Sequence, residues 1–188
     1  FAPGMIAALR ARAGHDGVSN VEAAVMDAQS LSLPDGSVDV AFCMFAFMFF
    51  PDRARAFQEL HRVLRPGGRA VIATWAPIER RPMMKLGFDA LAEAAPDAPR
   101  PQKGDLQHPD ECVAEMSAAG FRNVEAHAFT DSIRVESADE YCDFMVRTGP
   151  PFAALRKRLG EAEWSALLDR IVAALRRRIP EGGTELSA

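Results

Sequence analysis

The first half of the chain alternates between short apolar runs and one amphipathic segment. Residues 21–25 are mostly β-branched or small, and residues 38–43 are almost uninterruptedly apolar, which is typical of a strand covered on both faces. Asp52 is expected to cap a helix, because apolar residues recur at helical spacing in the segment that follows it. The Pro-Gly-Gly sequence at residues 66–68 is expected to end this helix. A third apolar run follows at residues 69–75. The pattern therefore predicts a βαβ unit of a parallel sheet.

Outside this unit the pattern is mainly helical. It predicts helices at residues 3–13, 83–95 and 109–119, a strand at residues 121–129, and a helix ending at residue 147 behind a capping box of Ser137 and Glu140. A short helix ending near Gly160 and a long one at residues 162–179 come next. Prolines on both sides of the helix at 83–95 indicate an irregular flap. We expect an α/β core over residues 1–136, a helical insertion or cap over 137–180, and a tail over 181–188.

Composition narrows the class of protein. The 188 residues are 48% hydrophobic and 26% charged, as in an ordinary globular domain, and the net charge of -4 argues against a nucleic-acid partner. The arginine cluster at residues 176–178 falls at the end of a predicted helix, where cations complement the helix dipole. No apolar run approaches the ~20 residues of a membrane span, so we expect a soluble protein with no integral membrane contact, and the reduced thiols expected from its cysteines favour a cytoplasmic location. Three cysteines without close spacing indicate reduced thiols, and no metal-ligand spacing is present.

Several short motifs occur in a fixed order along the first half. They are APGM at residues 2–5, MDA at 26–28, LP at 33–34, SVD at 37–39, an aromatic-rich turn at 43–52, and HRVLRPGG at 61–68. Together they resemble the class I S-adenosylmethionine-dependent methyltransferases, in particular the ubiquinone and menaquinone biosynthesis branch. The resemblance implies a Rossmann-like parallel sheet, incomplete at both ends in this sequence, and S-adenosyl-L-methionine as cofactor. The family's first strand, glycine-rich loop and ribose-binding acid would precede Phe1, and we expect further residues upstream because the chain does not open on Met.

The resemblance also assigns residues to the cofactor. It implies that Asp27, Ala28 and Gln29 lie on the adenine side, with the Asp27 carboxylate accepting from the adenine amino group and the Ala28 N–H donating to a ring nitrogen. From the residues alone, an Asx turn explains Asp27 better, since such turns are common at strand ends. Two further groups complete the implied cofactor site: Cys43, Met44 and Phe45 along the methionine and sugar, and Phe1 and Met5 at the start of the first helix.

The acceptor side is less defined, and no residue is certain to be catalytic. Met48 falls where many relatives carry a histidine near the acceptor, so no acid–base help is expected from it. Trp75 ends its strand in a position that suits either the core or the pocket. His108 precedes a helix, as either an acceptor contact or a solvated loop residue.

Two functions follow from the resemblance. We expect an enzyme that methylates a small, apolar or amphipathic acceptor by in-line displacement. The alternative is a non-catalytic methyltransferase-like module for binding or dimerisation, and a homodimer is left open in either case.

Overall fold

The computed structural model describes residues 3–97 and 106–187. The chain divides into two compact units. The N-terminal unit comprises residues 1–75 and 104–126, and the C-terminal unit comprises residues 76–103 and 127–188. The stretches 76–97 and 127–136, which the sequence assigned to the core, thus fall in the same unit as the C-terminal helices. The linear division into core, cap and tail stays a prediction.

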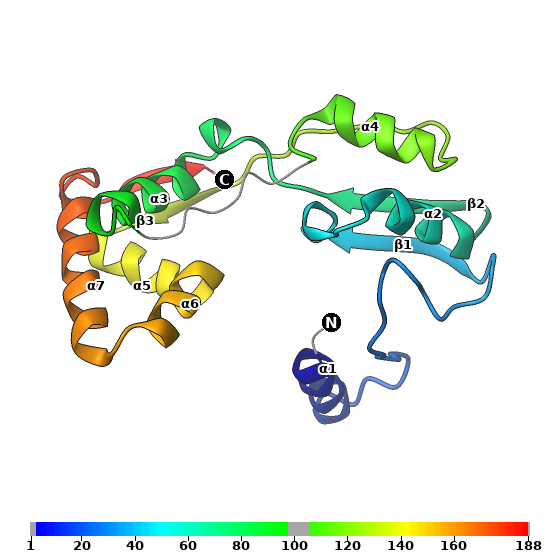
Figure 1. Ribbon diagram of the computed structural model, residues 1–188, viewed down its shortest axis with the longest axis horizontal. Coiled ribbons are helices and arrows are strands. Elements are labelled where there is room, and N and C mark those ends of the chain that lie inside the picture. The colour runs from blue at the N-terminus through cyan, green and yellow to red at the C-terminus, as the bar shows by residue number, and fades with distance from the viewer. Residues whose placement is uncertain (1–2, 98–105, 188) are drawn as a thin grey trace. The chain divides into compact units, whose positions relative to one another are not determined.

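The N-terminal unit is built on the predicted βαβ element. Strand β1 (Val38–Met44) pairs in parallel with β2 (Leu64–Ala73), and helix α2 (Arg53–Val63) connects them, as Figure 1 shows. The oxygen of the Asp52 side chain accepts from the Arg55 N–H at 2.9 Å, so the expected helix cap is confirmed. The expected α/β class, with a parallel sheet, is confirmed as well.

Strand β2 begins five residues earlier than the sequence predicts. Leu64 already pairs with Val38, and the register then shifts before Val40 pairs with Arg69. Gly68 sits in this irregular part, where a Cβ atom would lie 2.9 Å from the Arg65 carbonyl oxygen. The Pro-Gly-Gly segment therefore forms a bulge inside the strand and is not a separate turn between helix and strand.

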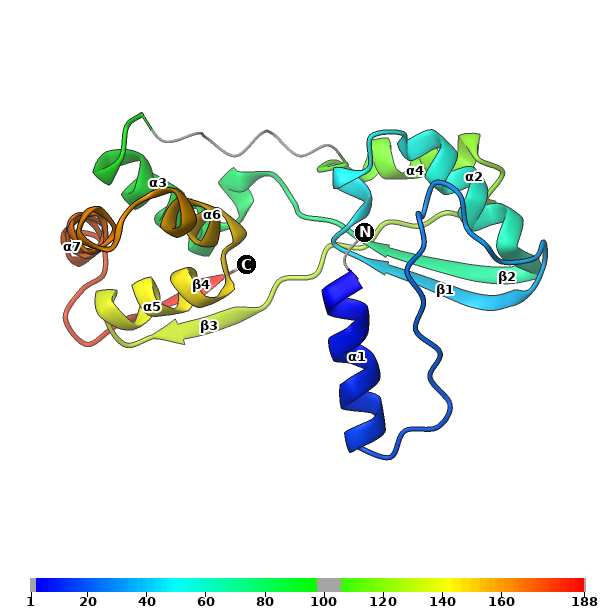
Figure 2. The same ribbon diagram turned by 60° about the horizontal axis from the view of Figure 1, so that its bottom comes forward.

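Only one face of this sheet is covered among the described residues. Helix α2 and helix α4 (Pro109–Ala118) lie on the same side of β1 and β2, as Figure 2 shows. Phe57 of α2 and Met116 of α4 are buried there. On the opposite face the side chains of Val40, Phe42 and Met44 are exposed. The expectation that residues 38–43 are covered on both faces is therefore wrong for the described part of the chain.

Two predicted strands are absent from the described residues. Helix α1 (Pro3–His15) confirms the first predicted helix, but residues 21–25 are irregular, and only an isolated bridge between Asp27 and Ser30 follows them. Residues 121–129 are irregular too, and Phe129 is 86% exposed. A strand exists only through its ladder with a neighbour, and no described segment pairs with either stretch.

The C-terminal unit is a helical layer with a small sheet. Its helices are α3 (Pro82–Ala94), α5 (Ala138–Thr148), α6 (Pro150–Arg158) and α7 (Glu161–Arg176), preceded by the short η2 (Ile78–Arg80). Tyr141, Ile171 and Leu175 are 1% exposed in its core. These helices confirm the sequence pattern to within a few residues. The predicted capping box is only half formed, because Ser137 caps the Glu140 N–H while the Glu140 carboxylate accepts from Glu136.

Residues 184–187, within the predicted tail, form a strand. Strand β4 (Thr184–Ser187) pairs antiparallel with β3 (Ser132–Val135), with Ile133 opposite Leu186, so this part of the predicted tail is paired within the C-terminal unit. Figure 2 shows the two strands beside α5. The strand TELS is short and polar at its ends, and nothing in its own composition marks it as paired.

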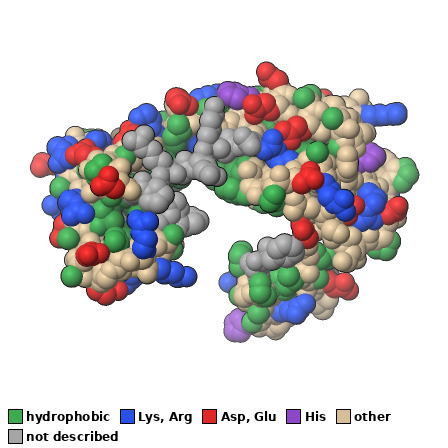
Figure 3. Space-filling view, viewed as in Figure 1, with side chains coloured by type: hydrophobic (Ala, Val, Ile, Leu, Met, Phe, Trp, Pro, Cys, Tyr) green, Lys and Arg blue, Asp and Glu red, His purple; other side chains and the backbone are tan. Residues whose placement is uncertain are grey.

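Charges on the C-terminal unit are largely balanced. Arg176 bonds to Asp139, while Arg177 and Arg178 both pair with Glu93. On the face drawn in Figure 3, basic and acidic side chains are interspersed.

None of the described helices is long and apolar enough to cross a bilayer. The described residues also contain no cluster of three or more potential metal ligands.

The aromatic core under the parallel sheet should dominate the stability of the N-terminal unit. Phe57 is 1% exposed and stacks on Phe47, with ring centroids 4.1 Å apart. We predict that Phe57→Ala lowers the free energy of unfolding by about 3–5 kcal/mol, because a buried ring is replaced by a cavity. The neighbouring Phe49 in η1 (Phe47–Phe49) is 73% exposed, so Phe49→Ala should change the free energy of unfolding by about 0.5 kcal/mol or less. Urea unfolding measures both, and equal losses would contradict this picture of the core.

Candidate functional site

An ion-paired arginine holds the segment between α1 and β1 onto helix α2. Arg62 donates to the carbonyl oxygens of Leu31 and Leu33, each at 2.9 Å, and to Asp35 at 2.5 Å. Its Nε donates to Glu59 at 2.8 Å, and the other carboxylate oxygen of Glu59 accepts from the Leu31 N–H, also at 2.8 Å. We call this set of bonds the Arg62 clamp. It fixes a segment that has no strand pairing of its own.

The clamp is charged at neutral pH. The hydrogen bond from Arg62 is the main cause that lowers the pKa of Glu59 to about 2, and the bonds to Glu59 and Asp35 raise the pKa of Arg62. The side chains of Glu59 and Arg62 are 17% and 30% exposed. Solvent therefore screens the pair only in part.

Asp27 lies four residues before Leu31, the first residue that the clamp holds, and forms an Asx turn. Its Oδ1 accepts from the backbone N–H of Gln29 at 2.9 Å and from the side-chain Nε2 of Gln29 at 3.2 Å. These bonds lower the pKa of Asp27. Both end on the same oxygen, and no described residue donates to Oδ2. The turn predicted from the residues alone is confirmed, and its two hydrogen bonds do not use Oδ2.

The turn after β1 presents an aromatic surface. Phe45 has a positive φ of 56° and donates its N–H to the Ala73 carbonyl at 2.9 Å. Its ring stacks on Trp75, with centroids 4.1 Å apart and planes inclined by 21°. Positive φ is uncommon for a residue with a Cβ, and such backbone strain gathers at functional sites. The strand ends therefore carry a constrained, half-exposed aromatic pair.

Met44 and Cys43 point to opposite faces of β1. The Met44 side chain is exposed on the uncovered face, whereas Cys43 is partly buried against the cluster that contains Phe57. Burial raises the pKa of the Cys43 thiol, and bonds with the backbone of Ala46 and Phe47 offset this in part. A thiol with a raised pKa is a poor nucleophile, so Cys43 is a packing residue here.

The other residues expected in the site lie in different settings. Ala28 is half-buried beside Asp27, and Met48 is buried. His108 is exposed at the start of α4, and its side chain makes no capping bond. Met5 is 74% exposed on α1, and Phe1 lies outside the described residues. The structure brings Asp27 and Gln29 together and pairs Phe45 with Trp75; the ligand roles of all the expected residues stay predictions.

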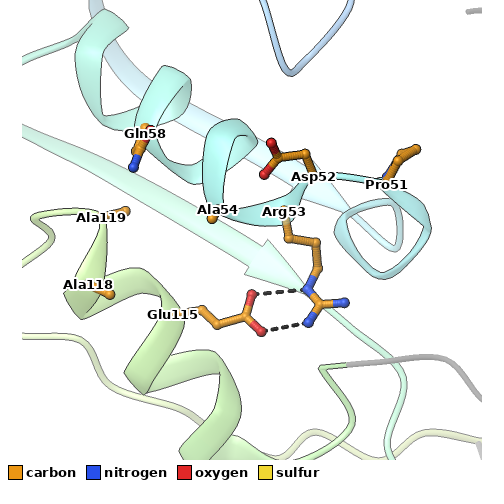
Figure 4. Close-up of a pocket in the computed structure, with 8 residues that line it drawn as sticks. All are labelled: Pro51, Asp52, Arg53, Ala54, Gln58, Glu115, Ala118 and Ala119. Atoms are coloured by element: carbon orange, nitrogen blue, oxygen red, sulfur yellow. Dashed lines mark hydrogen bonds and ion pairs between the residues drawn. The ribbon is translucent and has the colours of Figure 1, made fainter.

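A separate cavity of about 370 Å³ opens between α2 and α4. Figure 4 shows Arg53 and Glu115 facing one another there, joined by bonds of 3.0 and 2.7 Å. Its lining comprises Pro51, Asp52, Arg53, Ala54, Gln58, Glu115, Ala118 and Ala119. None of the residues expected in the site lines it, Arg53 and Glu115 pair with one another, and the Asp52 carboxylate caps helix α2. We therefore do not take it as the ligand site.

Sequence reasoning missed the residues that hold the site. Arg62 belongs to the motif HRVLRPGG at 61–68, but the motif does not indicate its partners. Glu59 lies three residues before Arg62 on the same helix, at a spacing that allows the two side chains to pair. Their bonds to the loop, 28–31 residues away, leave no local pattern. Gln29 also bonds to Asp52 and Arg55, which no spacing rule would suggest.

Comparisons with known proteins match the same part of the chain. A family model described as a methyltransferase domain matches residues 1–72. A demethylmenaquinone methyltransferase of Thermus thermophilus is 42% identical over 77 residues, which are 41% of this chain and 34% of that protein. Another, of Staphylococcus carnosus, is 30% identical over 131 residues, covering 62% of this chain and 54% of the relative. The chain thus spans between a third and about half of the length of these relatives.

Solved structures share the fold. The YcgJ protein of Bacillus subtilis aligns with a TM-score of 0.55 at 20% sequence identity, covering 98% of this chain and 73% of that one. At this identity the likeness bears on the fold alone. The Rossmann-like α/β class and the family resemblance found in the sequence are both confirmed.

The Arg62 clamp should make stability depend on pH in the acid range. The pKa of Glu59 lies near 2 in the folded state, below the ordinary value of 4.5. The ionised carboxylate of Glu59 therefore adds to the free energy of unfolding above pH 4.5, and this contribution is lost as the pH falls towards 2. We predict that Glu59→Gln is less stable at pH 7 and loses less stability than the parent protein between pH 4.5 and 2. Urea midpoints across this range measure it. Glu22→Gln, at an exposed position of the same unit, is the control and should follow the parent profile.

Proposed function

We propose that this chain, whose residues 1–72 match a methyltransferase domain model, forms at least part of an enzyme that transfers a methyl group from S-adenosyl-L-methionine to a small, apolar or amphipathic acceptor. One observation carries the proposal. The Asp27 carboxylate is held by two hydrogen bonds on Oδ1, while none of the described residues donates to Oδ2. This is the acceptor that an adenine amino group requires.

The adenine side of the cofactor suits residues 27–29. An ionised carboxylate offers only acceptors, so the open Oδ2 of Asp27 fits the two donors of an exocyclic amine. The Ala28 N–H, next along the turn, is a donor of the kind that an adenine ring nitrogen accepts. The Asx turn orients both groups, so little conformational freedom has to be lost on binding.

The reactive side of the cofactor suits the ends of the two strands. When bound, S-adenosylmethionine supplies an electrophilic methyl group on a sulfonium. Met44 and the pair of Phe45 and Trp75 offer polarisable and aromatic surfaces, which attract a soft cation. Their role is to orient the two reactants and exclude water, since alignment supplies much of the acceleration of a displacement.

The same surface and the relatives support the proposed class of acceptor. Both relatives described above are named for methylating demethylmenaquinone. An aromatic pair at the strand ends supports a flat, apolar acceptor of this type, with Trp75 as one wall. The buried Met48 has no group that can move a proton, and His108 is the remaining candidate for that task. The cytoplasmic location and the homodimer stay predictions.

Calorimetry with S-adenosylhomocysteine tests the proposal. We predict saturable binding by the 188-residue chain that Asp27→Ala weakens by about ten- to a hundredfold, because a hydrogen bond to a charged group contributes about 1.5–3 kcal/mol. Asp110→Ala is the matched control. Asp110 is an exposed carboxylate in the first turn of α4 in the same unit, and its removal should leave the affinity unchanged.

The outcomes separate the two candidate functions. If the folded chain does not bind S-adenosylhomocysteine, the proposal fails for this chain and the non-catalytic module is favoured. If binding is seen but Asp27→Ala and Asp110→Ala behave alike, the cofactor does not use Asp27 and the assignment of the adenine side is wrong.

A further inference from the structure

Gln29 joins the Asx turn to the start of helix α2. Its side-chain Nε2 donates to Asp27 Oδ1 at 3.2 Å, and its Oε1 accepts from the backbone N–H of Asp52 at 2.8 Å. Its carbonyl oxygen accepts from Arg55 Nε at 2.7 Å. Both ends of the amide and the main chain of Gln29 are therefore engaged within the protein.

The direction of this amide is dictated by its partners. The Asp52 N–H can only donate, so the atom that faces it must be the amide oxygen, and the amide nitrogen must face Asp27. Asp52 in turn is fixed as the cap of α2 through its bond with the Arg55 N–H. A continuous relay of hydrogen bonds thus runs from the helix start through Gln29 to the carboxylate of Asp27.

The relay restricts what the carboxylate can bind. Oδ1 receives both donors of Gln29, so the oxygen left for a ligand is Oδ2. Two donors on a carboxylate also favour its ionised form, which accepts hydrogen bonds and donates none. An ionised Oδ2 suits an amino group and repels a carbonyl oxygen at the same place.

We propose that Gln29 is a positioning residue that makes the site select a purine carrying an amino group over one carrying a carbonyl at that ring position. It acts through Asp27 and does not contact the ligand, which changes the role that sequence resemblance assigned to it. The inference rests on the proposed function, because it requires that Asp27 faces the base of the cofactor.

A pair of ligands that differ at one purine substituent tests it. Calorimetry would compare S-adenosylhomocysteine with S-inosylhomocysteine, in which a carbonyl replaces the amino group. We predict that the parent chain prefers the adenosyl compound by about ten- to a hundredfold, as expected for one charge-assisted hydrogen bond exchanged for a repulsion. In Gln29→Met, which keeps the length of the side chain but not its amide, the preference should fall at least about threefold.

Two further variants separate positioning from folding. Gln29→Ala should lower the preference in the same way, and it serves as a second test if Gln29→Met does not fold. Gln58→Ala, at an exposed glutamine on α2, should keep the parent preference. Thermal unfolding of each variant is measured alongside, because a purely structural role would lower the melting temperature without changing the ratio of the two affinities.

Each outcome has a distinct meaning. If neither compound binds to the folded parent chain, the proposed function fails and the relay has no ligand to act on. If S-adenosylhomocysteine binds and both Gln29 variants keep the parent preference, the proposed function stands and this inference is overturned. The inference is also overturned if Gln58→Ala changes the preference as much as the Gln29 variants do.

Discussion

The Arg62 clamp is the interaction on which the candidate site depends. No described strand pairs with residues 21–36, so backbone ladders do not position Asp27. Position comes instead from side chains of helix α2. Close to Asp27, Gln29 is held by Asp52 and Arg55. The Arg62 guanidinium bonds two loop carbonyls and two carboxylates, and Glu59 holds the Leu31 N–H. Arginine suits this place because its planar fork presents several donors in fixed directions. Lysine could keep the charge but could not reproduce the set of bonds.

The clamp works because helix α2 is itself firmly placed. Phe57 and Leu60 bury the inner side of α2 against the sheet, and Ala41 and Ile72 of the strands pack on the same cluster. Glu59 and Arg62 project from that helix towards the loop. Burial of the helix thus fixes the charged groups, and the charged groups fix the loop. The aromatic pair of Phe45 and Trp75 needs no such help, because it is attached directly to the strand ends.

The sequence predicted what depends on local pattern. Helical spacing located all the helices that pack in the two units, the Asp52 cap was visible from one residue, and the Asx turn at Asp27 followed from its side chain. Strands were predicted less well, because a strand is defined by its partner. Residues 21–25 have strand-like composition and no described partner, while the polar residues of β4 form a strand because β3 lies beside them. The clamp was missed because its donors and acceptors are about thirty residues apart.

Family resemblance and geometry contribute different parts of the site. Resemblance pointed to Asp27, Ala28 and Gln29 as one group on the adenine side, without distinguishing their tasks. Hydrogen-bond direction distinguishes them, because the Asp52 N–H fixes the Gln29 amide and the amide then leaves a single oxygen of Asp27 open. The proposed selectivity for the base is therefore set from the start of helix α2, where Asp52 acts on Asp27 through Gln29. A residue can thus shape recognition while its own polar atoms all point into the protein.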